Sequence, residues 1–306
     1  MQLPEELQFI INGRRSQKRT IARLDGKTCI ITGATSGVGL ATARRIAQGG
    51  ANLILVNRNQ DKALKVKEEI QREYGCKIDL YKADFSDLLQ VRDTATHILG
   101  KHPRIDALIN NAGIHNNSRQ LTKNGIEMVF CVNHLASFLL TRLLLERIKE
   151  SAPSSILYVN SQGHRFGGLN LEDLNWEKRR YSGYQSYGAA KTAQLLTVWE
   201  LADQLRGTGV TVNAMHPGGV TTNIGMNNGF LYRNYQRYLL FPFLSNPKIS
   251  GEAIYYLIAA PEMGGVTGKY YNQTIEEKPA LHALDPEKGK KLWKISDELI
   301  GLAGEV

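Results

Sequence analysis

The sequence predicts a single α/β domain in which a parallel sheet carries helices on both faces, the doubly wound arrangement. Short apolar runs alternate with helical patterns along most of the chain. A glycine-rich turn follows the first apolar run. No change in composition divides the 306 residues, although their number alone would allow one large domain or two small ones. We therefore expect one domain.

The strands and helices follow one another in a regular order. The first apolar run ends in a glycine and is typical of a buried strand. Each of the first six runs is followed by a helical pattern or a long connection, so the strands are joined by crossovers and are expected to be parallel. We expect strands at 27–32, 51–56, 77–83, 105–109, 155–159 and 210–215, and helices at 39–47, 61–74, 88–99, 126–149 and 187–205.

Two long stretches interrupt this order. The first, 165–183, separates the fifth strand from its helix, and the second, 218–247, follows the sixth strand. Loops of this length in a compact domain are usually functional, and the second stretch is too apolar to be disordered. We expect a lid over an apolar substrate around 219–247, with a packing helix or a subunit contact as the alternative. Its large apolar residues are Phe230, Leu231, Tyr232, Tyr235, Tyr238, Leu239, Leu240, Phe241 and Phe243.

The overall composition is that of a soluble globular protein, because the shares of hydrophobic residues (42%) and charged residues (22%) are ordinary. No apolar run approaches the roughly 20 residues that cross a bilayer, and the first residues do not resemble a signal peptide. The three cysteines, Cys29, Cys76 and Cys131, lack metal-site spacing and are expected to be inert thiols of a cytoplasmic protein.

Part of the net charge of +9 lies in a basic leader segment, residues 1–25. We expect this leader to be solvated or frayed and the domain to occupy 26–306. Contact with an anionic partner or a membrane surface is the less favoured alternative. No basic groove with interleaved aromatic residues indicates nucleic-acid binding. The basic residues of the leader are Arg14, Arg15, Lys18, Arg19 and Arg23.

The glycine-rich turn at 32–39 is the first candidate binding element. It lies between the first strand and the first helix, where glycines let the backbone turn tightly and approach a pyrophosphate. The amino end of the helix supplies oriented N–H donors to the same phosphates. Glycines also close ordinary loops, but the position after a buried strand favours a dinucleotide site.

Tyr187 and Lys191 are the first candidate catalytic pair. Because they lie four residues apart in a predicted helix, their side chains project from one face. A free phenol has a pKa of about 10, and a neighbouring ammonium stabilises the phenolate and lowers that pKa. The small residues between them leave room for a ligand.

These motifs together resemble the short-chain dehydrogenase/reductase family. The turn has the spacing Thr-Gly-x-x-x-Gly-x-Gly, and the resemblance covers nearly the whole chain. It implies a Rossmann-type fold and hydride transfer between a nicotinamide and a carbonyl or alcohol carbon. The other matching residues occur in order on the matching elements: Asn110-Asn111-Ala112-Gly113, Asn133, Ser161, Tyr187 with Lys191, and Pro217-Gly218.

Finer features resemble the retinol-dehydrogenase-like branch of this family. They are the stretch 132–141, the Ser161-Gln162-Gly163-His164 turn, the long separation between the serine and the tyrosine, and the stretch 292–299. The chain departs from the family at Asn160, where a serine often stands. The start shows no clear membrane anchor, so we expect a cytoplasmic rather than a membrane-bound enzyme.

The resemblance implies catalytic roles for four residues. Tyr187 is expected to exchange the proton of the reaction, and Ser161 to hydrogen-bond the reacting oxygen. Lys191 is expected to lower the pKa of Tyr187 and to bind the nicotinamide ribose. Asn133 is expected to hold a water that links Lys191 to solvent. His164 is expected to be a hydrogen-bonded loop histidine, with a substrate contact as the alternative.

The end of the second strand favours NADP(H) over NAD(H). A carboxylate there would bind the adenosine ribose and repel a 2′-phosphate, but the chain has Asn57-Arg58, and Arg58 can pair with a phosphate. Asp84 is placed to contact the adenine amine or to cap a helix with Ser86. The expected cofactor-binding residues are Gly33, Thr35, Ser36, Gly37, Val38, Gly39, Asn57, Arg58, Asp84, Phe85, Asn111, Ala112, Gly113, Tyr187, Lys191, Pro217, Gly218 and Thr222.

We therefore expect an NADP(H)-dependent oxidoreductase that acts on a carbonyl or alcohol of a lipophilic small molecule, without a metal. Two alternatives stay open. One is reduction of a C=C bond in a large ring, as in the related protochlorophyllide reductases. The other is a non-catalytic cofactor-binding scaffold, although such a protein has no need of all four catalytic residues.

The resemblance also implies a homodimer or homotetramer, because the long helices that carry Asn133 and Tyr187 commonly pair between subunits. A further apolar stretch, 255–257, belongs either to a subunit contact or to the core. The last helix is expected to dock on the core rather than to bind a membrane. Its apolar residues recur at helical spacing: Leu292, Ile295, Leu299 and Leu302.

Overall fold

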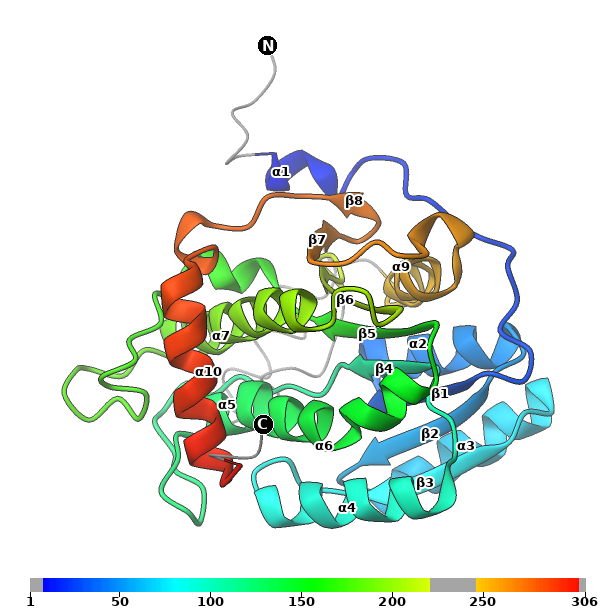
Figure 1. The fold of residues 1–306 in the computed structure, drawn as a ribbon, viewed down its shortest axis with the longest axis horizontal. Coiled ribbons are helices and arrows are strands. Elements are labelled where there is room, and N and C mark those ends of the chain that lie inside the picture. Colours follow the sequence, from blue (N-terminus) through cyan, green and yellow to red (C-terminus); the bar gives the residue numbers. More distant parts are fainter. Residues whose placement is uncertain (1–7, 221–245, 303–306) are drawn as a thin grey trace.

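The structure, a computed structural model, describes residues 8–220 and 246–302. Its centre is an eight-stranded sheet with the order β3-β2-β1-β4-β5-β6-β7-β8 (Figure 1). Neighbouring strands are parallel except β7 and β8, which are antiparallel. The six predicted strands are all present, and the parallel sheet is confirmed. The strands are β1 (Thr28–Thr32), β2 (Asn52–Asn57), β3 (Ile78–Lys82), β4 (Ala107–Asn110), β5 (Ser154–Val159), β6 (Val210–His216), β7 (Lys269–Asn272) and β8 (Ile275–Glu276).

Helices cover both faces of the sheet, as the doubly wound arrangement requires. One face packs against α2, α3 and α9, and the other against α4, α6 and α7 (Figure 1). The α-helices are α1 (Phe9–Asn12), α2 (Gly37–Gln48), α3 (Gln60–Tyr74), α4 (Leu88–Lys101), α5 (Met128–Phe130), α6 (Ala136–Glu150), α7 (Gly183–Gln204), α9 (Lys248–Ala259) and α10 (Pro286–Ile300).

Two hydrophobic cores lie on the two faces of the sheet. Consecutive strand residues alternate between them, so that Ile30 belongs to one core and Ile31 to the other, and both are fully buried. The register places Ile31 beside Leu55 of β2 and beside Ile109 of β4. Strands that are buried on both faces need apolar side chains at every position, which explains the unbroken apolar runs in the sequence.

The long helix expected at 126–149 is interrupted. α5 leads into one π-helical turn, Cys131–Leu135, and α6 continues from it. Contrary to the sequence-based expectation, the stretch Met128–Glu150 is long and apolar enough to span a bilayer by length and composition. However, 78% of its most apolar window is buried inside the domain, which is the burial of a core helix.

No helix or strand was predicted at α9, β7 or β8. Tyr255 and Tyr256 of α9 and Tyr270 of β7 are each 1% exposed, and Leu257 is 4% exposed. The stretch 255–257 therefore belongs to the core and not to a free apolar surface. The two strands are too short, at four and two residues, to show a clear alternation in the sequence.

Residues 9–25 are held against the domain and do not form a frayed leader: α1 lies beside β8, and the chain then passes α9 on its way to β1 (Figure 1). The Asn12 side chain donates a hydrogen bond to Glu277 (2.9 Å), and the backbone N–H of Lys18 donates to Thr274 (2.8 Å). The Tyr255 hydroxyl donates to the carbonyl of Ala22 (2.6 Å). The basic side chains of this segment are exposed, as expected for solvated charges.

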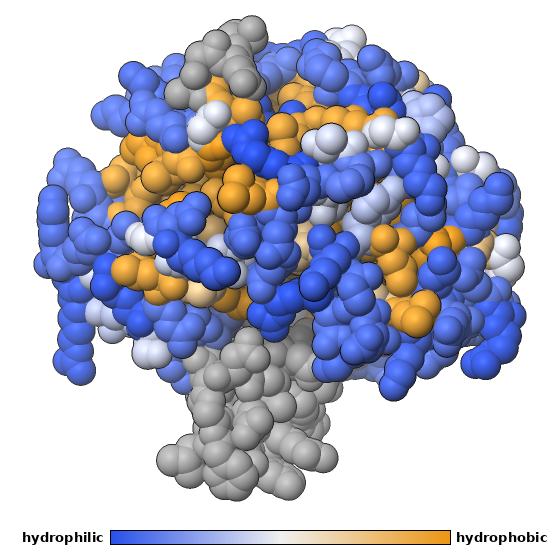
Figure 2. Space-filling view, turned by 90° about the horizontal axis from the view of Figure 1, so that it is seen from below, coloured by the Kyte–Doolittle hydropathy of each residue, from blue (hydrophilic) through white to orange (hydrophobic). Residues whose placement is uncertain are grey.

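α10 docks on α6 and α7, as predicted for the last helix. Leu292 is fully buried and Ile300 is 4% exposed, whereas Leu299 is 40% exposed and faces solvent. Arg142 of α6 forms an ion pair with Asp297 (2.5 Å). The chain itself thus covers one side of α7, and pairing of this helix between subunits stays a prediction. Most of the surface seen in Figure 2 is hydrophilic, with hydrophobic residues gathered mainly to one side.

Candidate active site

A cavity of about 890 Å³ opens at the carboxyl ends of the central strands. It lies where the strand order reverses between β1 and β4, which is where open α/β sheets bind ligands. Every predicted site residue that the structure describes lines this cavity, with the exception of Asn133. Thr222 and most of the predicted lid, 219–247, lie outside the described residues.

The glycine-rich turn is held in place by the ends of two neighbouring strands. The Asn57 side chain accepts a hydrogen bond from the Ala34 N–H (2.7 Å), and the Asn111 side chain donates to the carbonyls of Thr32 (2.8 Å) and Gly33 (3.1 Å). A Cβ atom at Gly39 would lie 2.2 Å from the Gly33 carbonyl oxygen. The turn therefore closes tightly onto the amino end of α2, leaving its N–H groups to face the cavity.

The cavity is cationic at the end of β2. Arg58 and Lys62, the latter in the first turn of α3, both line it and are exposed. Within the described residues, neither side chain forms an ion pair. Asp84 lines the same end, and its carboxylate accepts hydrogen bonds from the N–H (2.9 Å) and hydroxyl (2.7 Å) of Ser86. Asp84 thus caps a turn with Ser86, while α4 has its own cap, Asp87.

The turn after β5 fixes Ser161 from three directions. Its N–H donates to the Asn160 side chain (2.8 Å), and its hydroxyl accepts from the Gly163 N–H (3.0 Å). His164 accepts the Ala280 N–H at Nε2 (3.1 Å), so its Nδ1 carries the proton and donates to the Ser161 carbonyl (2.7 Å). Burial lowers the pKa of His164 to about 4. His164 is therefore neutral and hydrogen-bonded, as the sequence predicted.

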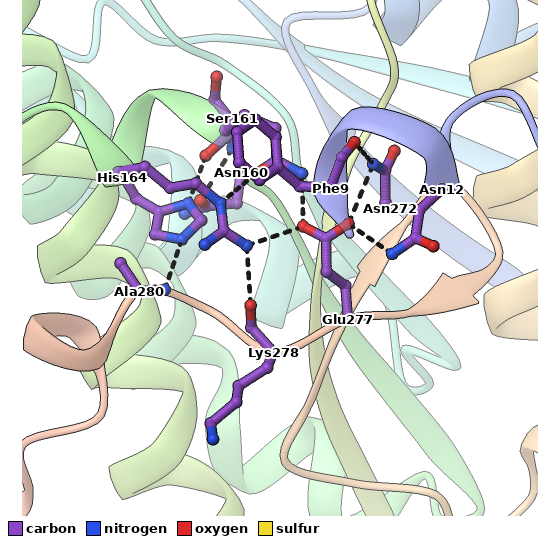
Figure 3. A network of polar contacts seen from close by, with 11 residues as sticks. Phe9, Asn12, Asn160, Ser161, His164, Asn272, Glu277, Lys278 and Ala280 are labelled. Atoms are coloured by element: carbon purple, nitrogen blue, oxygen red, sulfur yellow. Dashed lines mark hydrogen bonds and ion pairs between the residues drawn. The ribbon is translucent and has the colours of Figure 1, made fainter. Parts of the chain in front are cut away.

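Glu277 ties this turn to the amino-terminal segment (Figure 3). Its carboxylate, 1% exposed, accepts hydrogen bonds from Gln162 (2.6 Å), Arg165 (3.0 Å), Asn12 (2.9 Å) and Asn272 (3.1 Å). A buried carboxylate is tolerated only when it is paired and hydrogen-bonded in this way. The network therefore depends on all of these partners being folded together.

Tyr187 lies against the backbone of the same turn. A Cβ atom at Gly163 would lie 2.8 Å from the Tyr187 ring, so only glycine allows this approach. Burial raises the pKa of Tyr187 to about 12, and its hydrogen bond with Ser161 opposes this rise. The prediction that the pKa of Tyr187 is lowered is thus wrong for the chain alone. Burial raises this pKa by more than the hydrogen bond with Ser161 lowers it. Tyr187 is a protonated phenol at neutral pH.

Lys191 points from α7 toward the end of β5. Its ammonium donates to the Val159 carbonyl (2.9 Å) and to the Gln194 side chain (3.0 Å). The nitrogen lies 5.7 Å from the centre of the Tyr187 ring. Burial lowers the pKa of Lys191 to about 7. The pair predicted from its spacing is thus brought together at one end of the cavity.

Asn133 lies behind the cavity, in the π-helical turn. Its side chain donates to the Ile114 carbonyl (2.9 Å) and accepts from the Ile114 N–H (2.7 Å), which fixes the loop after Gly113. Its backbone carbonyl accepts from the Gln194 side chain (2.5 Å) and from the Ser137 hydroxyl (3.1 Å). The Gln194 side-chain amide therefore connects the Asn133 carbonyl to the Lys191 ammonium, and the expected water stays a prediction.

Several site residues were not predicted from the sequence, among them Lys62, Gln194, His216 and Glu277. Lys62 follows Arg58 by four residues, and Gln194 follows Lys191 by three. This helical spacing from predicted site residues could have indicated both. His216 directly precedes Pro217 and lines the cavity. Glu277 gave no local signal, because it meets its partners only through the tertiary fold.

The residues of the cavity lie within a match to a known protein family. The model described as short chain dehydrogenase matches residues 27–229, which contain the turn, the serine, the tyrosine and the lysine. The chain belongs to the short-chain dehydrogenase/reductase family. This dehydrogenase/reductase is therefore an oxidoreductase, and the matched residues contain strands β1 to β6.

Two curated relatives and one solved structure show which members of the family this chain is similar to. Human retinol dehydrogenase 13 is 37% identical over 299 residues, covering 96% of this chain and 89% of the relative. A Streptomyces protein, strain C5, assigned as the daunorubicin C-13 ketoreductase DnrU, is 37% identical, covering 91% of this chain and 94% of the relative. The crystal structure of an uncharacterized Mycobacterium paratuberculosis protein superposes with a TM-score of 0.74 at 28% identity, covering 94% of this chain and 98% of that one. The predicted resemblance to the retinol-dehydrogenase-like branch is confirmed.

Proposed function

We propose that this dehydrogenase/reductase transfers a hydride between NADP(H) and a carbonyl or alcohol carbon of a lipophilic small molecule. One observation carries the proposal. Ser161, Tyr187 and Lys191 line the same cavity as the glycine-rich turn, so a dinucleotide bound on the turn would extend toward the proton-transfer residues.

The residues of the cavity fit a dinucleotide. The turn closes tightly, because a Cβ atom at Gly39 would lie 2.2 Å from the Gly33 carbonyl oxygen, and a turn of this kind lets phosphates approach its backbone. Asn57 and His216 both line the cavity, and each has one buried polar atom (Nδ2 and Nδ1) without a hydrogen-bond partner within the described residues. Buried polar groups are normally satisfied, so both atoms suit a polar ligand. The bound nicotinamide supplies or accepts the hydride.

The chain's own residues handle the proton. In the reduction, the carbonyl carbon receives the hydride and the carbonyl oxygen becomes negative, and the Tyr187 phenol donates its proton to that oxygen. The Ser161 hydroxyl, fixed by its turn, donates a hydrogen bond to the same oxygen as its charge develops. Lys191, when charged, stabilises the phenolate that remains. Oxidation of an alcohol runs through the same groups in reverse.

The preference for NADP(H) rests on the charges at the end of β2. Arg58 and Lys62 provide two cations at the end of β2 that would hold a 2′-phosphate of the adenosine ribose, and Asn57 leaves no carboxylate there to repel it. An arginine can pair with the phosphate through two parallel hydrogen bonds.

Replacing Arg58 by glutamate is expected to lower the ratio of kcat/KM for NADPH to that for NADH by about tenfold or more, since a charged hydrogen bond is lost and a repulsion is added. The measurement is a comparison of the two cofactors by initial rates. Lys65→Glu, an exposed charge reversal on α3 that does not line the cavity, is the matched control and should leave the ratio unchanged. A wild-type preference for NADH would contradict the proposal.

Two kinds of support favour a lipophilic substrate. Retinol dehydrogenase 13 and the DnrU ketoreductase, both 37% identical, carry names that refer to retinol and daunorubicin, molecules with large carbon frameworks. Ile114, Met128 and Val132 give the cavity apolar walls. The aromatic stretch 230–243, which suggested a lid, lies outside the described residues and supports the proposal by composition alone.

The proposed function can be tested by following NADPH absorbance with a panel that includes retinal, steroid ketones, quinones and small polar aldehydes. We expect turnover with the lipophilic carbonyls and much less with the polar ones. Turnover restricted to C=C bonds of large rings would favour the ring-reductase alternative. Tight NADPH binding without turnover of any member would favour a non-catalytic scaffold.

A further inference from the structure

Gln194 is a buried side chain next to the proton-transfer residues that the proposed mechanism does not use. It is 0% exposed and lies on α7, three residues after Lys191. Its oxygen accepts hydrogen bonds from the Lys191 ammonium (3.0 Å) and the Asn160 side chain (3.1 Å). Its nitrogen donates to the Asn133 carbonyl (2.5 Å). One amide thus joins α7, the end of β5 and the π-helical turn.

The orientation of this amide is determined by its partners. The Asn133 carbonyl can only accept, and Lys191 can only donate, so the amide oxygen must face the lysine. Asn160 reinforces this orientation, because its side-chain nitrogen donates both to Gln194 and to the Lys191 carbonyl (2.9 Å). A flipped amide would place its N–H groups against two donors.

The same contacts determine how Lys191 is presented to the cavity. An ammonium has three donors, and two of them are directed to Val159 and Gln194. The remaining donor is available on the side of the cavity, which Lys191 lines together with Tyr187. Without Gln194, the buried ammonium would lose one of these two acceptors.

We propose that Gln194 is a positioning residue of the hydride-transfer site, which holds Lys191 in its charged, cavity-facing state and connects it to Asn133. The inference rests on the proposed function. It also gives Asn133 a role: its carbonyl orients the Gln194 amide.

If Gln194 has this role, its replacement should shift the pH dependence of kcat. A residue that only supports the fold would not cause such a shift when it is replaced. The titratable groups that face Lys191 are Tyr187 on its own helix and His216 at the end of β6. Burial raises the pKa of Tyr187 to about 12 and lowers that of His216 to about 4, so neither titrates near neutral pH. The pKa of Lys191 is about 7, and the charged form exists below it. Activity that needs the ammonium is therefore present at low pH and lost as the pH rises through this value.

The test compares two variants whose effects should have opposite signs. Gln194→Met keeps the side-chain size but removes the acceptor, which disfavours the ammonium, so the high-pH decline of kcat should move to lower pH by about one unit. Gln194→Glu places a carboxylate beside the ammonium, so the decline should move to higher pH by about one unit or more. The profiles are measured with NADPH and the best carbonyl of the panel.

Thr197→Val is the matched control, a near-isosteric change at a buried position on the same helix, three residues after Gln194. The Thr197 side chain is 2% exposed, and its hydroxyl has no hydrogen-bond partner within the described residues. The substitution removes a buried polar group without touching the contacts of Lys191, so the pH profile should stay unchanged.

Thermal unfolding of each variant shows whether it is folded. If Gln194→Met does not fold, the proposal is tested by the direction of the shift in Gln194→Glu alone. If the pH profiles of the two folded variants coincide with that of the wild type, or shift in the same direction as each other, the role of Gln194 is overturned. The proposed function still holds in that case, because the wild type turns over a carbonyl. A wild type that turns over no carbonyl overturns the proposed function and this inference together.

Discussion

Replacing Tyr187 by phenylalanine is expected to lower kcat by at least about a hundredfold, because a positioned acid or base contributes about 10²–10⁴ to a rate. The phenol is the proton donor of the proposed reduction, and burial keeps it protonated with a pKa of about 12. The ring itself stays, packed against Gly163, so the dissociation constant for NADPH should change by no more than about twofold. Single-turnover rates and a fluorescence titration of NADPH measure the two quantities.

Tyr184→Phe is the matched control for this experiment. It removes a hydroxyl from the same helix, three residues earlier, at a side chain that is 65% exposed. The control should keep its activity. Turnover by Tyr187→Phe at more than about a tenth of the wild-type rate would contradict the assignment of Tyr187 as the proton donor.

Replacing Gly39 by alanine is expected to weaken dinucleotide binding by about a hundredfold, since displacements of about 1 Å in a site can have effects of this size. The new Cβ would lie 2.2 Å from the Gly33 carbonyl oxygen and 2.5 Å from the Asn111 side chain, so the phosphate turn must open. The dissociation constant for NADPH is the direct measurement, and KM should rise with it.

Gly100→Ala controls for the change of residue type. Gly100 lies in α4, and a Cβ added there meets no neighbouring heavy atom within 4 Å, so this variant should bind NADPH as the wild type does. Thermal unfolding separates loss of the site from loss of the fold. Unchanged affinity in a folded Gly39→Ala variant would show that the turn does not contact the phosphates.

The elements with strong local patterns were predictable from the sequence. The inner positions of β1 and β2 are apolar because both faces of these strands are buried, and the turn between β1 and α2 is marked by its glycines. Tyr187 and Lys191 share a helical face by spacing alone. These features depend on neighbours in the chain, so the sequence contains them directly.

The features that the sequence did not show depend on distant neighbours or on burial. The π-helical turn around Asn133 departs from regular helix without a proline or glycine to mark it. The pKa of Tyr187 follows from desolvation, which a residue pattern does not measure. The Gln194 amide connects elements that meet only when the sheet is complete.

The contacts of Glu277 join segments that are made at very different times during synthesis. Asn12 and Glu277 are 265 positions apart in the chain, and Gln162 and Glu277 are 115 apart. Gln162 and Arg165, in the turn that holds Ser161, can bind Glu277 only after the ribosome has made residue 277. Contacts between such distant residues form late and slowly. We therefore expect a chain truncated before residue 277 to lack these bonds in the turn that holds Ser161.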